Sequence, residues 1–192
     1  MKTSTLRQAT LAAVLGLSVF TLAAPAAQAA TFDQVKADAS RVAFTYRQMG
    51  VAMDGKFNKF DARLNFDPAK PEAGQATVDI DVASVDAGSD EATAEVTGKT
   101  WFDAAKHPKA SFKSSSVKAL GGNRYEALGT LTIKGRSQNV TAPFTFDPAS
   151  GAFDGSFVIK RGDFAIGEGE WADFGIVANE IQVKFHLQAA HK

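Results

Sequence analysis

The chain has 192 residues, no cysteine, and a formal net charge of zero from 21 basic and 21 acidic residues. The length fits one domain after a leader, and the lack of cysteine excludes disulfides, thiol nucleophiles and thiolate metal sites. No basic stretch is interleaved with aromatic residues, so nucleic acid is not an expected partner.

Residues 1–29 have the pattern of a cleavable signal peptide. Lys2 and Arg7 form a basic start, an apolar run extends from Leu11 to Ala24, and Ala27-Gln28-Ala29 is a small-x-small cleavage motif. The run is shorter than the roughly 20 residues that span a bilayer. We therefore expect a removed leader rather than a membrane anchor, and an exported, most simply periplasmic, mature domain over 30–192.

Alternating apolar and polar residues predict eight β-strands in the mature domain. Side chains on a strand point to opposite faces with period two, so each run has an apolar and a polar face. In the second run, the phase changes near Asn58-Lys59, which predicts a bulge and a sharp bend. Glycine and proline clusters punctuate the runs. The predicted strands are residues 40–48, 53–66, 75–85, 109–120, 125–133, 139–146, 153–160 and 180–187.

Two longer connections lack strand periodicity. Residues 90–100, between the third and fourth strands, are rich in Ala, Glu and Thr, and Ser89 or Asp90 is a candidate cap for a short helix there. Residues 161–179 contain several glycines and Trp171 and are predicted to be irregular. Loops of this length are uncommon in compact domains and are usually functional.

Eight strands in simple succession predict an all-β fold, an antiparallel up-and-down barrel, because closure removes exposed sheet edges. Such a barrel is just wide enough to be filled by side chains or to hold one slender ligand. Large apolar residues on the strands and in the two long connections are typical of a lined cavity, although a packed core fits the same pattern. The candidate ligand-binding residues are Phe44, Tyr46, Phe57, Phe60, Ile80, Trp101, Phe102, Phe112, Leu131, Phe144, Phe157, Phe164, Trp171 and Phe185, with Arg47, Gln48 and Arg161 as candidate head-group contacts.

Residues suited to catalysis are sparse. The histidines are His107, His186 and His191, and the run Ser114–Ser116 lacks the glycine-flanked elbow of a hydrolase nucleophile. No metal-binding motif stands out. We therefore predict no catalytic residue, no metal and no cofactor. A lipid-modifying hydrolase that uses His107 and Ser114–Ser116 is kept as an alternative.

An ordered set of short motifs resembles the YceI-like family over nearly all of the mature chain. This resemblance implies an exported, lipocalin-like barrel of eight antiparallel strands that holds polyisoprenoids or other long amphiphiles, and it makes a homodimer plausible. The chain departs from the family pattern at Gln48 and at residues 90–95, where many relatives carry a histidine and an Arg-Asp pair with a histidine. The motifs are Ser40-Arg41-Val42-Ala43-Phe44, Gly55-Lys56-Phe57, Ser84-Val85-Asp86, Trp101-Phe102-Asp103, His107-Pro108, Phe112-Lys113-Ser114-Ser115, Gly129 to Gly135, and Arg161-Gly162-Asp163-Phe164.

The sequence thus predicts a non-catalytic carrier or reservoir for a long-chain isoprenoid or similar amphiphile. Burying about a dozen methylenes yields roughly 10 kcal/mol, whereas association costs an estimated 4–15 kcal/mol, so a long tail is favoured over a short apolar molecule. Besides the hydrolase, a filled β-domain that acts as an interaction module is kept as an alternative.

Overall fold

The computed structural model describes residues 31–191, which form one antiparallel sheet and one short α-helix. The predicted signal peptide, residues 1–29, lies outside the described residues. The strands are β1 (Phe32–Val35), β2 (Arg41–Gln48), β3 (Val51–Phe57), β4 (Phe60–Asn65), β5 (Gln75–Asp81), β6 (Val85–Asp86), β7 (Lys109–Gly121), β8 (Arg124–Ile133), β9 (Arg136–Asp147), β10 (Ala152–Lys160) and β11 (Glu180–His191), and the helix is α1 (Asp90–Thr97).

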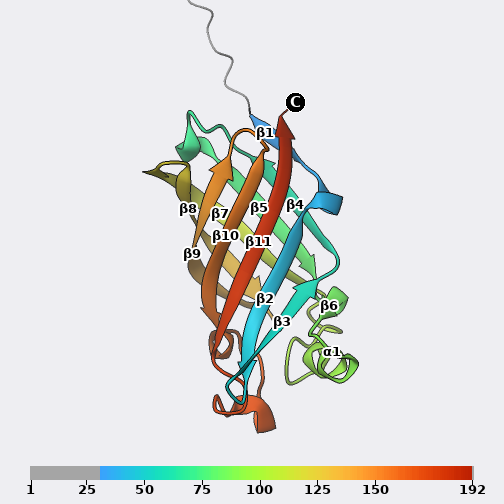
Figure 1. Cartoon of the computed structure of the whole chain (residues 1–192). Coiled ribbons are helices and arrows are strands. Elements are labelled where there is room, and N and C mark those ends of the chain that lie inside the picture. Colours follow the sequence, from blue (N-terminus) through green and yellow to red (C-terminus); the bar gives the residue numbers. More distant parts are fainter. Residues whose placement is uncertain (1–30, 192) are drawn as a thin grey trace, which may run out of the picture.

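The sheet curls around one long axis into a barrel-like shape (Figure 1). Its strand order is β4-β5-β7-β8-β9-β10-β11-β2-β3-β6, with β1 paired to β11 at the side of this path. Phe32 of β1 also forms an antiparallel bridge with Phe66, directly after β4, through backbone hydrogen bonds of 2.8 and 3.0 Å. β1 therefore connects one end of the sheet to its interior strand β11.

The prediction of an all-β antiparallel fold is confirmed, but the count of eight strands is wrong, because the sheet has 11. The predicted strand 53–66 is two strands, β3 and β4, separated at Asn58-Lys59. The Asn58 amide donates a hydrogen bond to the Ser84 carbonyl at 3.0 Å, and the Lys59 amide donates one to the Ser84 hydroxyl at 2.9 Å. The phase change in the sequence thus marks a full break rather than a bulge.

The other two additional strands are too short for a periodic pattern. β1 has four residues. The predicted strand 75–85 ends at Asp81, whose carboxylate accepts a hydrogen bond of 3.1 Å from the Ala83 amide and starts a 3₁₀ turn. The chain then forms the two-residue strand β6 against β3. The longer strand ends because the Asp81 side chain binds a backbone amide that would otherwise be free for strand pairing. The period of apolar residues does not reveal such a bond.

The predicted helix between the strands is confirmed as α1. The hydroxyl of Ser89 accepts a hydrogen bond of 3.2 Å from the Ala92 amide, so Ser89 is the cap, and Asp90 and Glu91 occupy the favourable first turn. Residues 161–179 form two 3₁₀ turns, Arg161–Phe164 and Gly169–Ala172, joined by irregular chain, as the sequence predicts.

The buried residues form two clusters at opposite ends of the barrel-like sheet. One gathers around Phe66 and Phe146, near β1. The other gathers around Trp101, Phe164 and Val177, near the connections that follow α1 and β10. We call these the β1 end and the loop end. The interior between them holds the candidate site.

Candidate functional site

Two adjoining apolar cavities occupy the interior of the curled sheet. The loop-end cavity has a volume of about 120 Å³ and the β1-end cavity about 110 Å³. Their linings are almost entirely apolar and share five residues, so the two cavities follow one another along the axis. The shared residues are Val42, Ile80, Leu131, Phe157 and Val183.

The structure brings most of the predicted ligand-binding residues together around these cavities. Phe60, Phe164 and Trp171 do not line them: Phe60 packs against the β1-end cluster and borders a separate hollow, and Phe164 and Trp171 pack in the loop-end cluster. The loop-end cavity is lined by Phe44, Tyr46, Phe57, Trp101 and Phe102, the β1-end cavity by Phe112, Phe144 and Phe185, and both by Ile80, Leu131 and Phe157.

Most of the aliphatic part of the cavity lining is not among the predicted site residues. Branched residues supply much of the wall between the rings, and most of them fall on the same strand parity as a predicted aromatic residue. Val42 precedes Phe44 by two positions, and Val183 and Ile181 precede Phe185 by two and four. Period two was therefore the signal that locates them. The missed residues include Val42, Val78, Val96, Ile159, Ile166, Ile181 and Val183.

Three cavity-lining phenylalanines lie over a glycine on a neighbouring strand. Phe44 covers Gly55, Phe112 covers Gly129, and Phe185 covers Gly155, and in each case a β-carbon on the glycine would overlap the ring. The first and third pairs are directly opposite in register. Because a glycine has no side chain, each ring lies along the wall instead of projecting inward, and the interior stays open.

Arg161 borders the loop-end cavity and organises the connection 161–179. Its side chain is 1% exposed, and the guanidinium donates hydrogen bonds to main-chain carbonyls of Ile166 (2.8 Å), Trp171 (2.8 Å) and Val177 (2.7 Å), among others. It forms no ion pair with a described carboxylate within 4.0 Å. Burial lowers the pKa of Arg161 from its ordinary value, but a guanidinium stays charged in proteins. The donors of Arg161 are directed at carbonyls of the connection 161–179. A contact between Arg161 and a head group stays a prediction.

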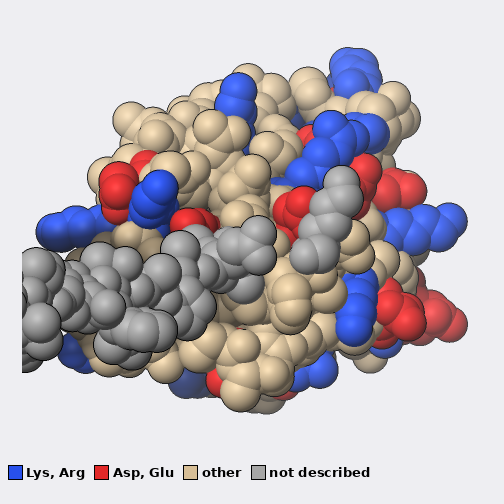
Figure 2. All heavy atoms as spheres, turned by 90° about the horizontal axis from the view of Figure 1, so that it is seen from above, with Lys and Arg blue, Asp and Glu red and all other residues tan. Residues whose placement is uncertain are grey.

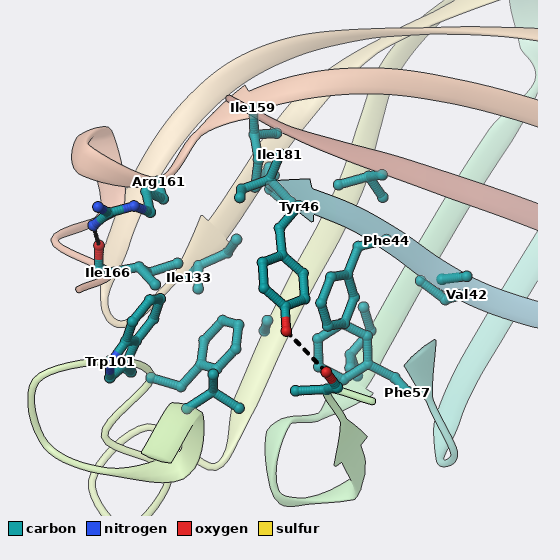
Figure 3. A pocket seen from close by; sticks show the side chains of 18 of the residues that line it. Val42, Phe44, Tyr46, Phe57, Trp101, Ile133, Ile159, Arg161, Ile166 and Ile181 are labelled. Atoms are coloured by element: carbon teal, nitrogen blue, oxygen red, sulfur yellow. Dashed lines mark hydrogen bonds between the residues drawn. The ribbon is translucent and has the colours of Figure 1, made fainter. Parts of the chain in front are cut away.

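The two tryptophans of the chain pack together, and Trp101 lies beside Arg161 (Figure 3). The ring centroids of Trp101 and Trp171 are 5.6 Å apart, and the Arg161 Cζ lies 5.6 Å from the Trp101 ring centroid, within range of a cation–π interaction. Trp101 is 7% exposed. Among the described residues, the buried side-chain nitrogen and oxygen atoms that lack a partner are the indole Nε1 atoms of these two residues.

Tyr46 is another polar group in the loop-end cavity. Its hydroxyl donates to the Ala87 carbonyl at 3.0 Å, as the dashed line in Figure 3 shows, and burial raises its pKa. Tyr46 is therefore neutral at physiological pH, with its proton directed at the backbone.

Arg47 and Gln48, the other predicted head-group contacts, lie outside the cavity linings at the end of β2. Arg47 is exposed and donates to the Gly50 carbonyl at 3.1 Å. Gln48 forms a bridge with Val177, so the end of β2 holds the connection 161–179 in place. A contact of either residue with a head group stays a prediction.

Two of the serines considered for catalysis form hydrogen bonds with the backbone of neighbouring strands. The Ser114 hydroxyl accepts a hydrogen bond from the Ala76 amide at 2.8 Å, and Ser115 donates to the Leu128 carbonyl at 3.2 Å. Across residues 31–191, no group of three or more His, Cys, Asp or Glu residues is arranged to hold a metal ion.

The exterior carries charges of both signs. Figure 2, a view onto the β1 end, shows basic and acidic side chains interspersed with uncharged surface, without one dominant patch. Within the part of the chain that the structure describes, no helix combines the length and apolar character needed to cross a membrane.

Comparison with known proteins assigns the domain. The profile of the YceI-like domain matches residues 34–189. A UPF0312 protein of Azotobacter vinelandii is 32% identical over 146 residues, which cover 72% of this chain and 74% of that protein.

Two solved structures share the fold. The crystal structure of Burkholderia cenocepacia BcnA matches with a TM-score of 0.79 and 46% identity, covering 82% of this chain and 100% of that chain. A polyisoprenoid-binding domain from Saccharophagus degradans, described as implicated in plant cell wall breakdown, matches with a TM-score of 0.62 and 15% identity, covering 85% of this chain and 99% of that chain. At that identity, the second likeness concerns the fold alone.

Proposed function

Since this chain belongs to the YceI-like family, we propose that it is an exported, non-catalytic carrier or reservoir that encloses the long tail of an isoprenoid or similar amphiphile. The observation that carries the proposal is the pair of adjoining apolar cavities along the axis of the sheet. A structural relative with the same fold is described as a polyisoprenoid-binding domain.

The shape and chemistry of the interior support a long apolar ligand. An empty apolar cavity destabilises a protein by about 24 cal/mol per Å³, so two cavities of about 120 and 110 Å³ would each cost about 3 kcal/mol if nothing filled them. A chain threaded through both would recover roughly 0.8 kcal/mol for each buried methylene. The glycine-backed phenylalanines keep this path open.

Native mass spectrometry of protein purified without detergent tests the proposal. We expect a co-purifying lipid, or uptake of an added prenyl or acyl chain with one molecule per protein chain. Displacement of a fluorescent fatty acid then gives the affinity. A protein that carries no lipid and takes up none is instead the filled interaction module, and the proposal fails.

The hydrolase alternative has a separate test. Lipid turnover by the wild type that is lost in Ser114→Ala or His107→Ala would establish catalysis and contradict the carrier. Lipid that is bound and released unchanged supports the carrier.

Export is part of the proposal and rests on the leader-like residues 1–29. Periplasmic fractionation of the expressed chain, with an intact-mass measurement of its N-terminus, tests it. Cleavage before Ala30 is expected. The family resemblance also predicts a homodimer, which light scattering of the mature domain checks.

A further inference from the structure

The inward-facing residues of β11 mark depth along the interior. Every second residue of a strand faces the same side, and successive ones lie about 7 Å apart along the strand. Ile181 lines the loop-end cavity, and Val183 lines both cavities. Phe185 and Leu187 line the β1-end cavity. Ala189, the next residue of this series, is buried but lines neither cavity. The apolar path along β11 therefore ends at Leu187.

Leu187 belongs to a layer of large side chains at the far end of the β1-end cavity. Its direct partner on β10 is Phe153. The ring centroid of Phe153 lies 5.3 Å from that of Phe66. All three side chains are buried and line the cavity. We call Phe66, Phe153 and Leu187 the floor of the cavity.

A second layer of rings packs behind the floor. The ring centroid of Phe146 lies 4.5 Å from that of Phe153 and 5.1 Å from that of Phe66. Phe32 of β1 packs on Phe146, with the ring centroids 4.8 Å apart. Neither Phe146 nor Phe32 lines a cavity. Because close-packed interiors yield little, a chain that reaches the floor has no room to advance further.

The opposite end of the interior is closed by connections rather than by paired strands (Figure 1). Trp101, Phe102, Ile166 and Val177 line the loop-end cavity from these connections. Segments outside the strand ladder open more readily than paired strands, so we expect the ligand to enter at this end. Apart from the exposed Gln75, the side chains that line the β1-end cavity are apolar. A polar head there would be desolvated without a partner, so the tail enters first.

We propose that the floor contacts the end of the ligand tail and sets the longest tail that the interior accepts. Each methylene that finds room strengthens binding about three- to fourfold. The first methylene beyond the floor has to displace packed side chains, which is unfavourable. This inference rests on the proposed function and adds to it the class of tail, a chain that ends inside the protein, and the residues that limit its length.

Displacement of a fluorescent fatty acid by saturated fatty acids, from decanoic to docosanoic acid, tests the proposal. Each acid is used below the concentration at which it aggregates. In the wild type, affinity is expected to rise with each added methylene up to a break length and then to fall. The path from Ile181 to Leu187 is about 20 Å long, which is shorter than the extended chain of docosanoic acid. A rise that continues through docosanoic acid would overturn the proposal.

Leu187 allows the break length to be moved in both directions. Leu187→Ala removes three carbon atoms from the floor and is expected to increase the break length by about three carbons, because the interior is otherwise close-packed. Leu187→Phe adds bulk at the same position and is expected to decrease the break length by a similar amount. Leu187→Phe leaves no void, so it reports on the floor even if Leu187→Ala fails to fold.

Phe146→Leu is the matched control. Phe146 is as deeply buried as the floor residues and belongs to the same cluster, but it does not line the cavity. The variant is expected to melt at a lower temperature than the wild type and to keep the wild-type break length. A shift of the break length as large as that in Leu187→Ala would overturn the assignment of the floor.

The two proposals fail in different ways. If no fatty acid binds to the wild type, the carrier function is wrong. If fatty acids bind and the break length is the same in the wild type and in both Leu187 variants, the carrier stands and the assignment of the floor is wrong.

Discussion

The ring of Phe44 on β2 lies over Gly55, its direct partner on β3, at a position where a β-carbon would overlap the ring. We predict that Gly55→Ala pushes the ring into the loop-end cavity and weakens binding of long chains. The variant is also expected to lose about 1–3 kcal/mol of stability, as over-packed sites do, because the Asp86 carbonyl would lie 2.7 Å from the new atom. Urea denaturation and fluorescent-probe displacement measure the two effects.

A double-mutant cycle separates the ring from the backbone contact. In a Phe44→Leu background, Gly55→Ala should reduce ligand affinity less than it does in the wild type, because the displaced ring is gone. An equal loss in both backgrounds would show that Phe44 does not mediate the effect.

Replacing Trp171 should affect ligand binding more than folding. Trp171 packs on Trp101, which lines the cavity. We predict that Trp171→Ala weakens long-chain binding by about 1–3 kcal/mol and costs less stability than Phe144→Ala, a truncation within the wall, where loss of about 3–5 kcal/mol is usual. Melting of the lipid-free proteins and lipid titrations check this. Should Trp171→Ala melt as early as Phe144→Ala and bind lipid normally, Trp171 is a structural plug.

Arg161 should be the strongest stability determinant of the loop end. Arg161→Lys keeps the positive charge but replaces a planar fork of five donors with three. The variant leaves several buried carbonyls among Ile166, Trp171 and Val177 without donors, and we expect a loss of at least about 2 kcal/mol.

Hydrogen exchange of residues 161–179 and urea denaturation measure this effect. The matched control is Arg63→Lys, at an exposed arginine on β4, where a change within about 0.5 kcal/mol is expected. Equal stabilities of the two variants would contradict a special role for Arg161.

The ion pair between Lys134 and Glu168 predicts a pH dependence of the loop end. Lys134 Nζ donates to Glu168 at 2.9 Å and to the Ala165 carbonyl at 2.7 Å. The hydrogen bond from Lys134 holds the pKa of Glu168 below its ordinary value of 4.5. A carboxyl whose pKa is lower in the folded state stabilises the protein above its unfolded pKa, and this contribution disappears as the pH falls through the folded pKa.

The melting temperature of Glu168→Gln should therefore lie below that of the wild type at neutral pH, and the difference should shrink as the pH falls from about 4.5. Glu170→Gln, at an exposed neighbour, is the control. A wild-type advantage that persists in strong acid would contradict the assignment of this ion pair.

Periodicity located the walls of the site well because strand parity is a local property. It predicted the strands that carry Phe44, Phe112 and Phe185 and therefore the rings that line the cavities. It did not predict β1 or β6, which are short and depend on partners far away in the chain.

The alternation of apolar and polar residues could not predict the contacts of Arg161. Arg161 was expected to meet a head group, and its donors point to carbonyls in three stretches of the connection, 166–167, 171–173 and 177–178. Those contacts depend on how residues 161–179 fold back on themselves, and the unpaired indoles depend on the meeting of two connections. Neither arrangement leaves a periodic trace in the sequence.

The pairing of β1 with β11 has a consequence for the order of events during folding. Phe32 is opposite His191, and Val35 is opposite Ala189, so the first described strand is completed by the last. Contacts of such large sequence separation are made late and slow the folding of β proteins, because a long loop must close first. An N-terminal fragment that stops before β11 cannot complete this seam. A tail can therefore be fully enclosed only after the whole chain is available, and a nascent chain should be unable to retain ligand.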